Sequence, residues 1–141
     1  MRASCLLPVL VLIALFCAPV SAQKCFGYGP VVTLTGKLHS RVFPGPPNYE
    51  SIRQGDQKET AYLLTLVKAI CTDGNDPQGI DVPESDLRDV QLVITNDAHW
   101  ATLHRLMGKR VTITGTLFHA HTGHHRTKVL AEVSSICAAT Q

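Results

Sequence analysis

Two nearly identical segments that lie far apart in the chain constrain its fold more than any other feature. They are VTLTGKL at residues 32–38 and VTITGTL at residues 111–117. Both alternate apolar residues with polar ones, mostly threonine, which is the pattern of a β-strand that buries one face. Both also contain an interior glycine, and a glycine in such a strand favours a bulge or a sharp bend. The segments therefore predict two similarly bent strands of a small β-barrel.

Three further segments have the composition of strands. They are TAYLLTLVKAIC at residues 60–71, VQLVIT at residues 90–95 and KVLAEVSSI at residues 128–136. Each is rich in apolar and β-branched residues, as strands of a packed sheet are. Together with the two repeated segments they bring the expected number of strands to five.

A helix is expected between the third and fourth of these strands. Asn96 or Asp97 can cap its start, and Gly108 stands where such a helix would end. The apolar residues between these limits recur at helical spacing; they are Trp100, Leu103 and Met107. This order of elements predicts a mainly β fold, a five-stranded OB-like Greek-key barrel with one helix between strands 3 and 4.

The first 22 residues have the three parts of a secretory signal peptide. Arg2 gives a basic start, residues 6–16 are apolar, and the small residues Ser21 and Ala22 come last. The apolar run is too short for an ordinary membrane span. We therefore expect cleavage after Ala22 and export to the periplasm or the extracellular space, with no transmembrane segment left. The product would be a single OB-like β-barrel domain over residues 23–141.

The charge balance argues against a partner that is a nucleic acid. The whole chain has 13 basic and 11 acidic residues, and the expected signal peptide removes one of the basic ones. Affinity for phosphate backbones depends on many cationic contacts, which a nearly neutral domain does not supply. Export would also separate the chain from nucleic acid.

Three cysteines remain after the expected cleavage: Cys25, Cys71 and Cys137. An exported protein meets oxidising conditions in which disulfides persist. Strands one and two should be antiparallel neighbours, so the end of the second returns near the start of the first. This topology favours a Cys25–Cys71 bridge, which would close a loop of about 46 residues and stabilise the fold by about 4 kcal/mol. Cys137 is expected to remain a buried free thiol.

Four of the seven histidines lie within FHAHTGHH, residues 118–125. Thr122-Gly123 fits a two-residue turn between the last two strands. In that register three histidines share one face of the hairpin and the fourth lies on the other. The three are His119, His121 and His124, and the fourth is His125. A slip of one residue would pair His119 with His125 instead, so the register stays open.

A transition-metal site is one interpretation of this cluster. Neutral imidazoles bind zinc, copper and nickel, and catalytic zinc sites commonly have three protein ligands. His119, His121 and His124 match that number, and Glu50 is the one acid or base available for a metal-dependent hydrolase. Arg126 opposes a cation, however, and there is no HExxH motif, so a metal cofactor ranks second.

A contact surface is the interpretation that the fold favours. In OB-folds the loops joining strands one to two and four to five lie at the same end of the barrel. Here the first of these loops contains FPGPPNYES, residues 43–51, in which prolines restrict the backbone and aromatic and amide groups offer contacts. The expected binding residues are Phe43, Asn48, Tyr49, Glu50, His119, His121, His124 and His125. The alternatives are a loop that only covers the barrel and a solvated polar hairpin.

No arrangement of a nucleophile with a base is apparent. The chain has no GxSxG motif, and neither Cys71 nor Cys137 has a histidine beside it in the sequence. We therefore predict no catalytic residues and favour a binding function over an enzymatic one.

Four stretches of the chain together resemble the bacterial family known as domain of unknown function 4431. They are TLTGKL, FPGPPNYESI, AYLLTLVKAIC and LMGKRVTITGTLFHAHTGHHRTKVL, which are spread over nearly all of the chain after the signal peptide. The resemblance implies an exported domain with cysteines like Cys25 and Cys71, and it implies no established activity. Some relatives resemble fusions with modules similar to periplasmic lysozyme inhibitors. By analogy alone, this favours an envelope module that contacts a protein, peptide or glycan.

Overall fold

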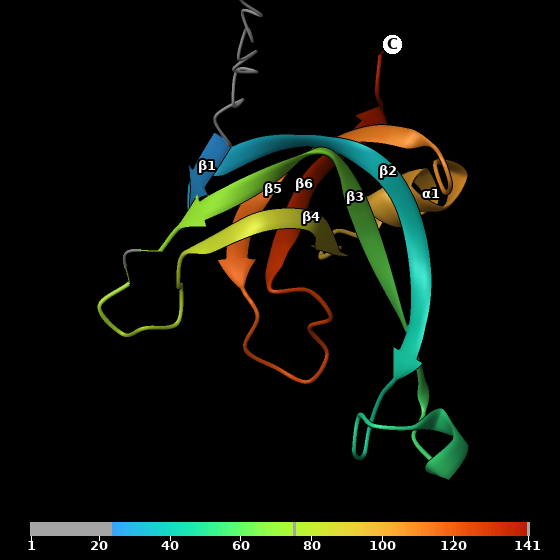
Figure 1. Ribbon diagram of the computed structural model, residues 1–141. Helices are drawn as coiled ribbons and strands as arrows, with labels where there is room; N and C mark the ends of the chain where they lie inside the picture. Colours follow the sequence, from blue (N-terminus) through green and yellow to red (C-terminus); the bar gives the residue numbers. More distant parts are fainter. Residues whose placement is uncertain (1–23, 75, 141) are drawn as a thin grey trace, which may run out of the picture.

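The computed structural model describes residues 24–74 and 76–140 (Figure 1). The expected signal peptide and its cleavage point lie outside these residues. The elements, in chain order, are β1 (Lys24–Gly27), β2 (Val31–Pro44), the 3-10 helix η1 (Ile52–Gln54), β3 (Lys58–Asp73), β4 (Glu84–Val93), α1 (Ala98–Arg105), β5 (Arg110–His119) and β6 (Val129–Ala138). The prediction of a mainly β fold with one α-helix is confirmed.

The strands form one six-stranded sheet in the order β1-β3-β2-β5-β6-β4, and β3 also pairs with β4. The expected five strands correspond to β2 through β6, so the predicted number was wrong by one. The missed strand, β1, has only four residues and no alternation of apolar and polar side chains. Its place in the sheet comes from parallel pairing with the end of β3, a long-range contact that no local pattern announces.

Strand β2 is strongly bent (Figure 1), and it changes partners at Gly36. Residues 31–37 pair with β5, and residues 36–44 pair with β3. A Cβ atom at Gly36 would overlap the carbonyl oxygen of Thr65 on β3. The glycine thus allows two backbones to approach closely at the bend, as the interior glycine predicted.

The second repeated segment has a bulge opposite its glycine. The ladder between β5 and β6 pairs Thr114 with Ser135 and then Gly115 with Val133, so Ser134 is an extra residue on β6. A Cβ atom at Gly115 would overlap the carbonyl oxygen of Glu132. Such a bulge bends the strand and turns one side chain out of the regular alternation.

One apolar cluster from the inner faces of the strands fills the interior, and α1 closes one side of it. The largest fully buried apolar side chains are Leu38, Leu64, Leu103, Ile113, Leu117 and Leu130. Leu103 is the one buried residue of α1. The helix begins after Asp97, and Asn96 Oδ1 accepts a hydrogen bond of 3.0 Å from the Ala98 amide, while Gly108 adopts a φ of 77°. The helix prediction is therefore confirmed.

The Cys25–Cys71 disulfide is present and joins β1 to β3. The two residues are paired directly across these strands, with their Cα atoms 4.2 Å apart. A disulfide of this kind indicates an oxidising compartment outside the cytoplasm. Cys137 is free but exposed, which corrects the expectation of a buried thiol. Residue 137 lies near the end of β6, where the strand no longer covers the core.

Within residues 24–74 and 76–140, no helix has the length and apolar character needed to cross a membrane.

Candidate functional site

The segment that contains the histidines is a nine-residue loop and not a two-residue turn. Strand β5 ends at His119, directly opposite Val129 at the start of β6, and residues 120–128 lie between them. Beyond this pair, one backbone hydrogen bond of 2.9 Å still joins the two sides of the loop, from the Ala120 amide to the Lys128 carbonyl. The predicted two-residue turn at Thr122-Gly123 is therefore wrong, and so is the register that placed three histidines on one face of a hairpin.

A buried glutamine on β4 explains why this loop opens. The Gln91 side-chain amide donates to the His124 carbonyl at 3.1 Å and accepts from the Arg126 amide at 2.5 Å. The Gln91 backbone amide also donates to Thr127 Oγ1 at 2.9 Å. These bonds replace the cross-strand bonds that a tight hairpin would have made. No motif around Gln91 marks it, which is why it was missed.

The loop between β2 and β3 is organised around another residue that was missed, the buried Asp56. One carboxylate oxygen accepts from the Asn48 amide at 2.9 Å and from Asn48 Nδ2 at 3.3 Å. The other accepts from the amides of Glu50 and Ser51, both at 2.8 Å. Bonds from the Ser51 and Asn48 amides to the charged form lower the pKa of Asp56 below its usual value.

These bonds hold Tyr49 in an uncommon conformation. Its φ of 61° lies in the left-handed region, which a bulky residue rarely adopts unless its surroundings impose it. Asp56 binds the amides on both sides of Tyr49 and so supplies that constraint. As a result, the Tyr49 ring points towards the histidine loop.

The two loops meet through Tyr49, His124 and Glu59. The Tyr49 hydroxyl lies 3.1 Å from His124 Nε2, and His124 Nδ1 lies 2.9 Å from Glu59 Oε2 on β3. The two rings are edge to face, with their centroids 5.3 Å apart. The Tyr49 ring also covers Gly123, where a Cβ atom would lie only 3.1 Å from it. Both loops lie at the same end of the sheet (Figure 1).

Arg126 fixes the base of this junction. Its side chain is only 9% exposed, its Nη2 lies 3.2 Å from Glu59 Oε2, and it donates to the Pro44 carbonyl at 2.8 Å. Its guanidinium lies 5.2 Å from the Phe43 ring centroid and 5.5 Å from that of Tyr49, within the range of cation–π attraction. Arg126, considered in the sequence only as an obstacle to a metal, therefore joins the two loops.

The other histidines have separate surroundings. His119 Nε2 lies 3.2 Å from Glu84 Oε1, and its Nδ1 lies 3.0 Å from the Ala120 carbonyl. Glu84 also accepts from Lys128 Nζ at 2.7 Å, and this bond is the main reason why the pKa of Glu84 is lowered. His119 therefore contacts a carboxylate of β4, whereas His124 contacts one of β3.

His121 and His125 pack against each other, with ring centroids 4.7 Å apart, and both contact the Phe118 ring. The His121 amide donates to His125 Nδ1 at 3.0 Å, which requires an unprotonated nitrogen there. Desolvation, followed by the charges of His121 and His124, lowers the pKa of His125. The hydrogen bond and the lowered pKa of His125 both favour the neutral form of this ring.

The structure thus joins part of the predicted contact surface and disperses the predicted metal ligands. Tyr49 contacts His124, and Phe43 is linked to Tyr49 through the Arg126 guanidinium. Asn48 and Glu50 are exposed on the same loop. His119, His121 and His124 have different neighbours, and the part of the chain that the structure describes contains no group of three or more His, Cys, Asp or Glu residues placed to hold a metal ion. We use "two-loop surface" below for residues 43–50 together with residues 120–125.

Because His119, His121 and His124 have separate surroundings, added metal ions should not stabilise the protein. We expect no saturable rise in the midpoint of thermal unfolding when zinc, copper or nickel is added to the metal-free protein at pH 7.5. A specific site filled at a hundred times its Kd would stabilise the fold by about 2.7 kcal/mol, an easily measured shift. A saturable rise that disappears in both His119→Ala and His121→Ala would contradict this expectation.

Low pH should destabilise the loop between β2 and β3, because Asp56 becomes protonated. Because the folded-state pKa of Asp56 is lowered, its stabilising contribution is present above the ordinary value of 3.8 and is lost as the pH falls through the lower folded value. Asp56→Asn should therefore destabilise the protein at pH 7, and the difference from the wild type should shrink below about pH 4. Urea unfolding between pH 7 and pH 3 measures both effects. Asp86→Asn, at an exposed residue of β4, is the matched control and should show neither.

The comparison with protein families agrees with the motifs in the sequence. Residues 89–137 match the family described as Domain of unknown function (DUF4431). The matched segment runs from the middle of β4 to the end of β6 and includes α1 and the whole histidine loop. No curated protein matches the chain significantly. Over residues 89–137, this chain is therefore similar to the domain of unknown function 4431 family, the same family that its motifs resemble.

Proposed function

We propose that this protein is an exported, non-enzymatic binding module of the bacterial envelope, which contacts a protein partner through its two-loop surface. The observation that carries the proposal is the joining of the two loops into one unit by Tyr49, His124, Glu59 and Arg126. Ordered loops lose little conformational entropy when they bind, and this is what a recognition surface needs.

The chemistry of this surface favours neutral polar recognition. Its exposed groups include the Asn48 amide, the Glu50 carboxylate and the His121 and His124 imidazoles, and its aromatic edge is Tyr49. Aromatic and histidine side chains combine an apolar body with polar atoms and are common in protein interfaces. The two loops project beyond the strands (Figure 1), a shape that suits insertion into a concave protein surface. A peptide or a glycan is the other possible occupant, and the experiment below separates them.

The fold that we propose is an OB-like barrel with an added strand. The pairings β3-β2-β5-β6-β4, with β4 returning to β3, support a closed arrangement of five strands to which β1 is attached. In that fold the loops at this end of the barrel commonly frame the binding site. The disulfide supports export, which would follow cleavage of the signal peptide after Ala22.

Site-specific crosslinking tests the proposal. A photoreactive residue at Glu50, whose side chain is exposed, should capture one envelope protein in growing cells, whereas the same residue at Lys68, an exposed position of β3, should not capture it. The purified partner should then bind Glu50→Ala/His121→Ala at least about tenfold more weakly and bind Lys68→Ala normally. These substitutions remove exposed side chains and leave the bonds of His124 in place. Equal capture at both positions would overturn the proposal, and so would specific binding of a peptidoglycan fragment or peptide in place of a protein.

A further inference from the structure

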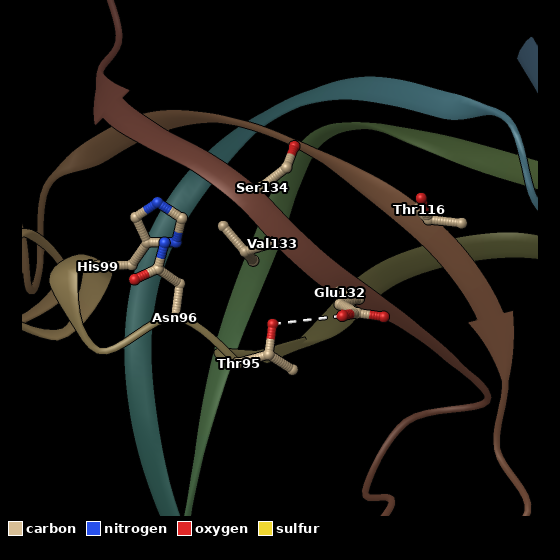
Figure 2. A pocket seen from close by; sticks show the side chains of 7 residues that line it. All are labelled: Thr95, Asn96, His99, Thr116, Glu132, Val133 and Ser134. Atoms are coloured by element: carbon tan, nitrogen blue, oxygen red, sulfur yellow. Dashed lines mark hydrogen bonds between the residues drawn. The ribbon is translucent and has the colours of Figure 1, made fainter.

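A second polar site lies on another part of the sheet, between the start of α1 and the outer side of β5 and β6. It is an open pocket of about 420 Å³, a volume within the range of small-molecule sites. Its lining comes from the β4–α1 connection, the first turn of α1 and the middle of both strands (Figure 2). The lining residues are Thr95, Asn96, His99, Thr116, Glu132, Val133 and Ser134. None of them belongs to the two-loop surface.

The bulge in β6 shapes this pocket. Ser134 is the extra residue of the bulge, and its hydroxyl lies 3.1 Å from both the hydroxyl and the carbonyl oxygen of Thr114. Beside it, Gly115 has no side chain that could separate the two strands. Bulges often turn a side chain towards a binding site, and this one brings a hydroxyl into the wall.

Glu132 gives the pocket its charge. Its Oε1 accepts a hydrogen bond of 3.2 Å from Thr95 Oγ1, drawn in Figure 2. Within residues 24–74 and 76–140, Glu132 has no ion-pair partner, and the seven lining residues include no lysine or arginine. A carboxylate surrounded by hydroxyl groups and unpaired with a cation favours a positively charged ligand and disfavours an anion.

The opposite wall contains an incomplete hydrogen-bonding group. His99 Nδ1 is buried and has no hydrogen-bond partner among the described residues. Buried polar atoms are nearly always paired, so this unpaired nitrogen shows that the polar wall formed by His99 is not completed by the protein's own hydrogen bonds. Asn96, next to it in Figure 2, adds a side-chain amide. The lining contains no phenyl or indole ring on which a flat aromatic ligand could stack.

We propose that this pocket binds a small molecule that carries a protonated amine and several hydroxyl groups, as a free amino sugar does. The ammonium would donate to Glu132, and the ligand hydroxyls would bond with Thr116, Ser134 and the His99–Asn96 wall. An ammonium group is a compact donor of three hydrogen bonds, which suits a carboxylate flanked by hydroxyls. The site is independent of the proposed contact surface.

Four probes separate the parts of this proposal. Glucosamine carries both the amine and the hydroxyls, N-acetylglucosamine lacks the charge, glucose lacks the amine, and propylamine lacks the hydroxyls. In amide NMR titrations of the purified protein, glucosamine should cause saturable shifts at Thr95, Asn96 and Glu132. The two uncharged sugars and propylamine should each bind at least about tenfold more weakly, because each loses one set of hydrogen bonds.

Substitutions test whether Glu132 is the residue that recognises the positive charge of the ligand amine. Glu132→Gln should weaken glucosamine binding about tenfold and abolish the preference over N-acetylglucosamine. Asp86→Asn removes a carboxylate elsewhere on the sheet and should leave binding unchanged, as should Glu50→Ala/His121→Ala on the two-loop surface. Equal binding of glucosamine and N-acetylglucosamine would overturn the proposal. Propylamine binding as tight as that of glucosamine would also overturn it, as would the absence of saturable shifts with any probe.

Discussion

Removal of the disulfide by Cys25→Ser/Cys71→Ser should lower the free energy of unfolding by about 4 kcal/mol. The bridge spans 46 residues of sequence, and a cross-link over a loop of that length restricts the unfolded chain strongly. It also anchors β1, which has only four residues and pairs with β3 at the edge of the sheet. The total stability of such a domain is on the order of 5–15 kcal/mol, so the loss would be a large fraction of it. Urea unfolding under non-reducing conditions measures the difference.

The control for this experiment is Cys137→Ser, which removes an exposed free thiol and should change stability by less than about 0.5 kcal/mol. Addition of a reducing agent should destabilise the wild type and leave the double variant unchanged. If the double variant were as stable as the wild type, the bridge would not hold β1 in place, and this view of the fold would be wrong.

Gly115→Ala should be strongly destabilising, although it adds only one methyl group. The new Cβ atom would overlap the Glu132 carbonyl oxygen and lie 3.3 Å from Val133 Cα, and both of these atoms belong to the backbone of the paired strand. A backbone cannot move aside as a flexible side chain can, so we expect a loss of about 3 kcal/mol or more. Thermal and urea unfolding of the purified variant measure this loss.

Gly27→Ala is the matched control. There the added Cβ atom would meet only the Pro30 ring, at 3.8 Å, which is ordinary van der Waals contact. This change should alter the free energy of unfolding by less than about 1 kcal/mol. Equal losses in the two variants would show that the close approach of β5 and β6 at Gly115 is not what makes the glycine necessary.

The parts of the fold that follow local rules could be predicted from the sequence. The alternation and interior glycines of residues 32–38 and 111–117 located two bent strands, and the stripe from Trp100 to Met107 located the helix. The disulfide followed from topology, because antiparallel neighbours return the chain to its start. Strand β1 could not be predicted from local patterns, because its pairing depends on contacts between residues 46 positions apart.

The candidate site could be predicted only as a meeting of two loops. Their shared end followed from the expected order of strands, and Tyr49 does meet His124. The predicted grouping of the histidines on one face was wrong because Gln91 determines the path of the histidine loop, although it lies 30 residues or more away in the sequence. Asp56 and Glu59 were missed for the same reason: their importance lies in which amides and rings they contact, and a single sequence does not display those contacts.

Amide hydrogen exchange of the protein, with and without the partner captured by crosslinking, tests whether both loops act together as one contact surface. We predict that binding slows exchange in residues 43–50 and residues 120–125 together, with little change in α1. Protection confined to one loop, or centred on α1 and the outer side of β6, would show that the two loops do not form one contact surface.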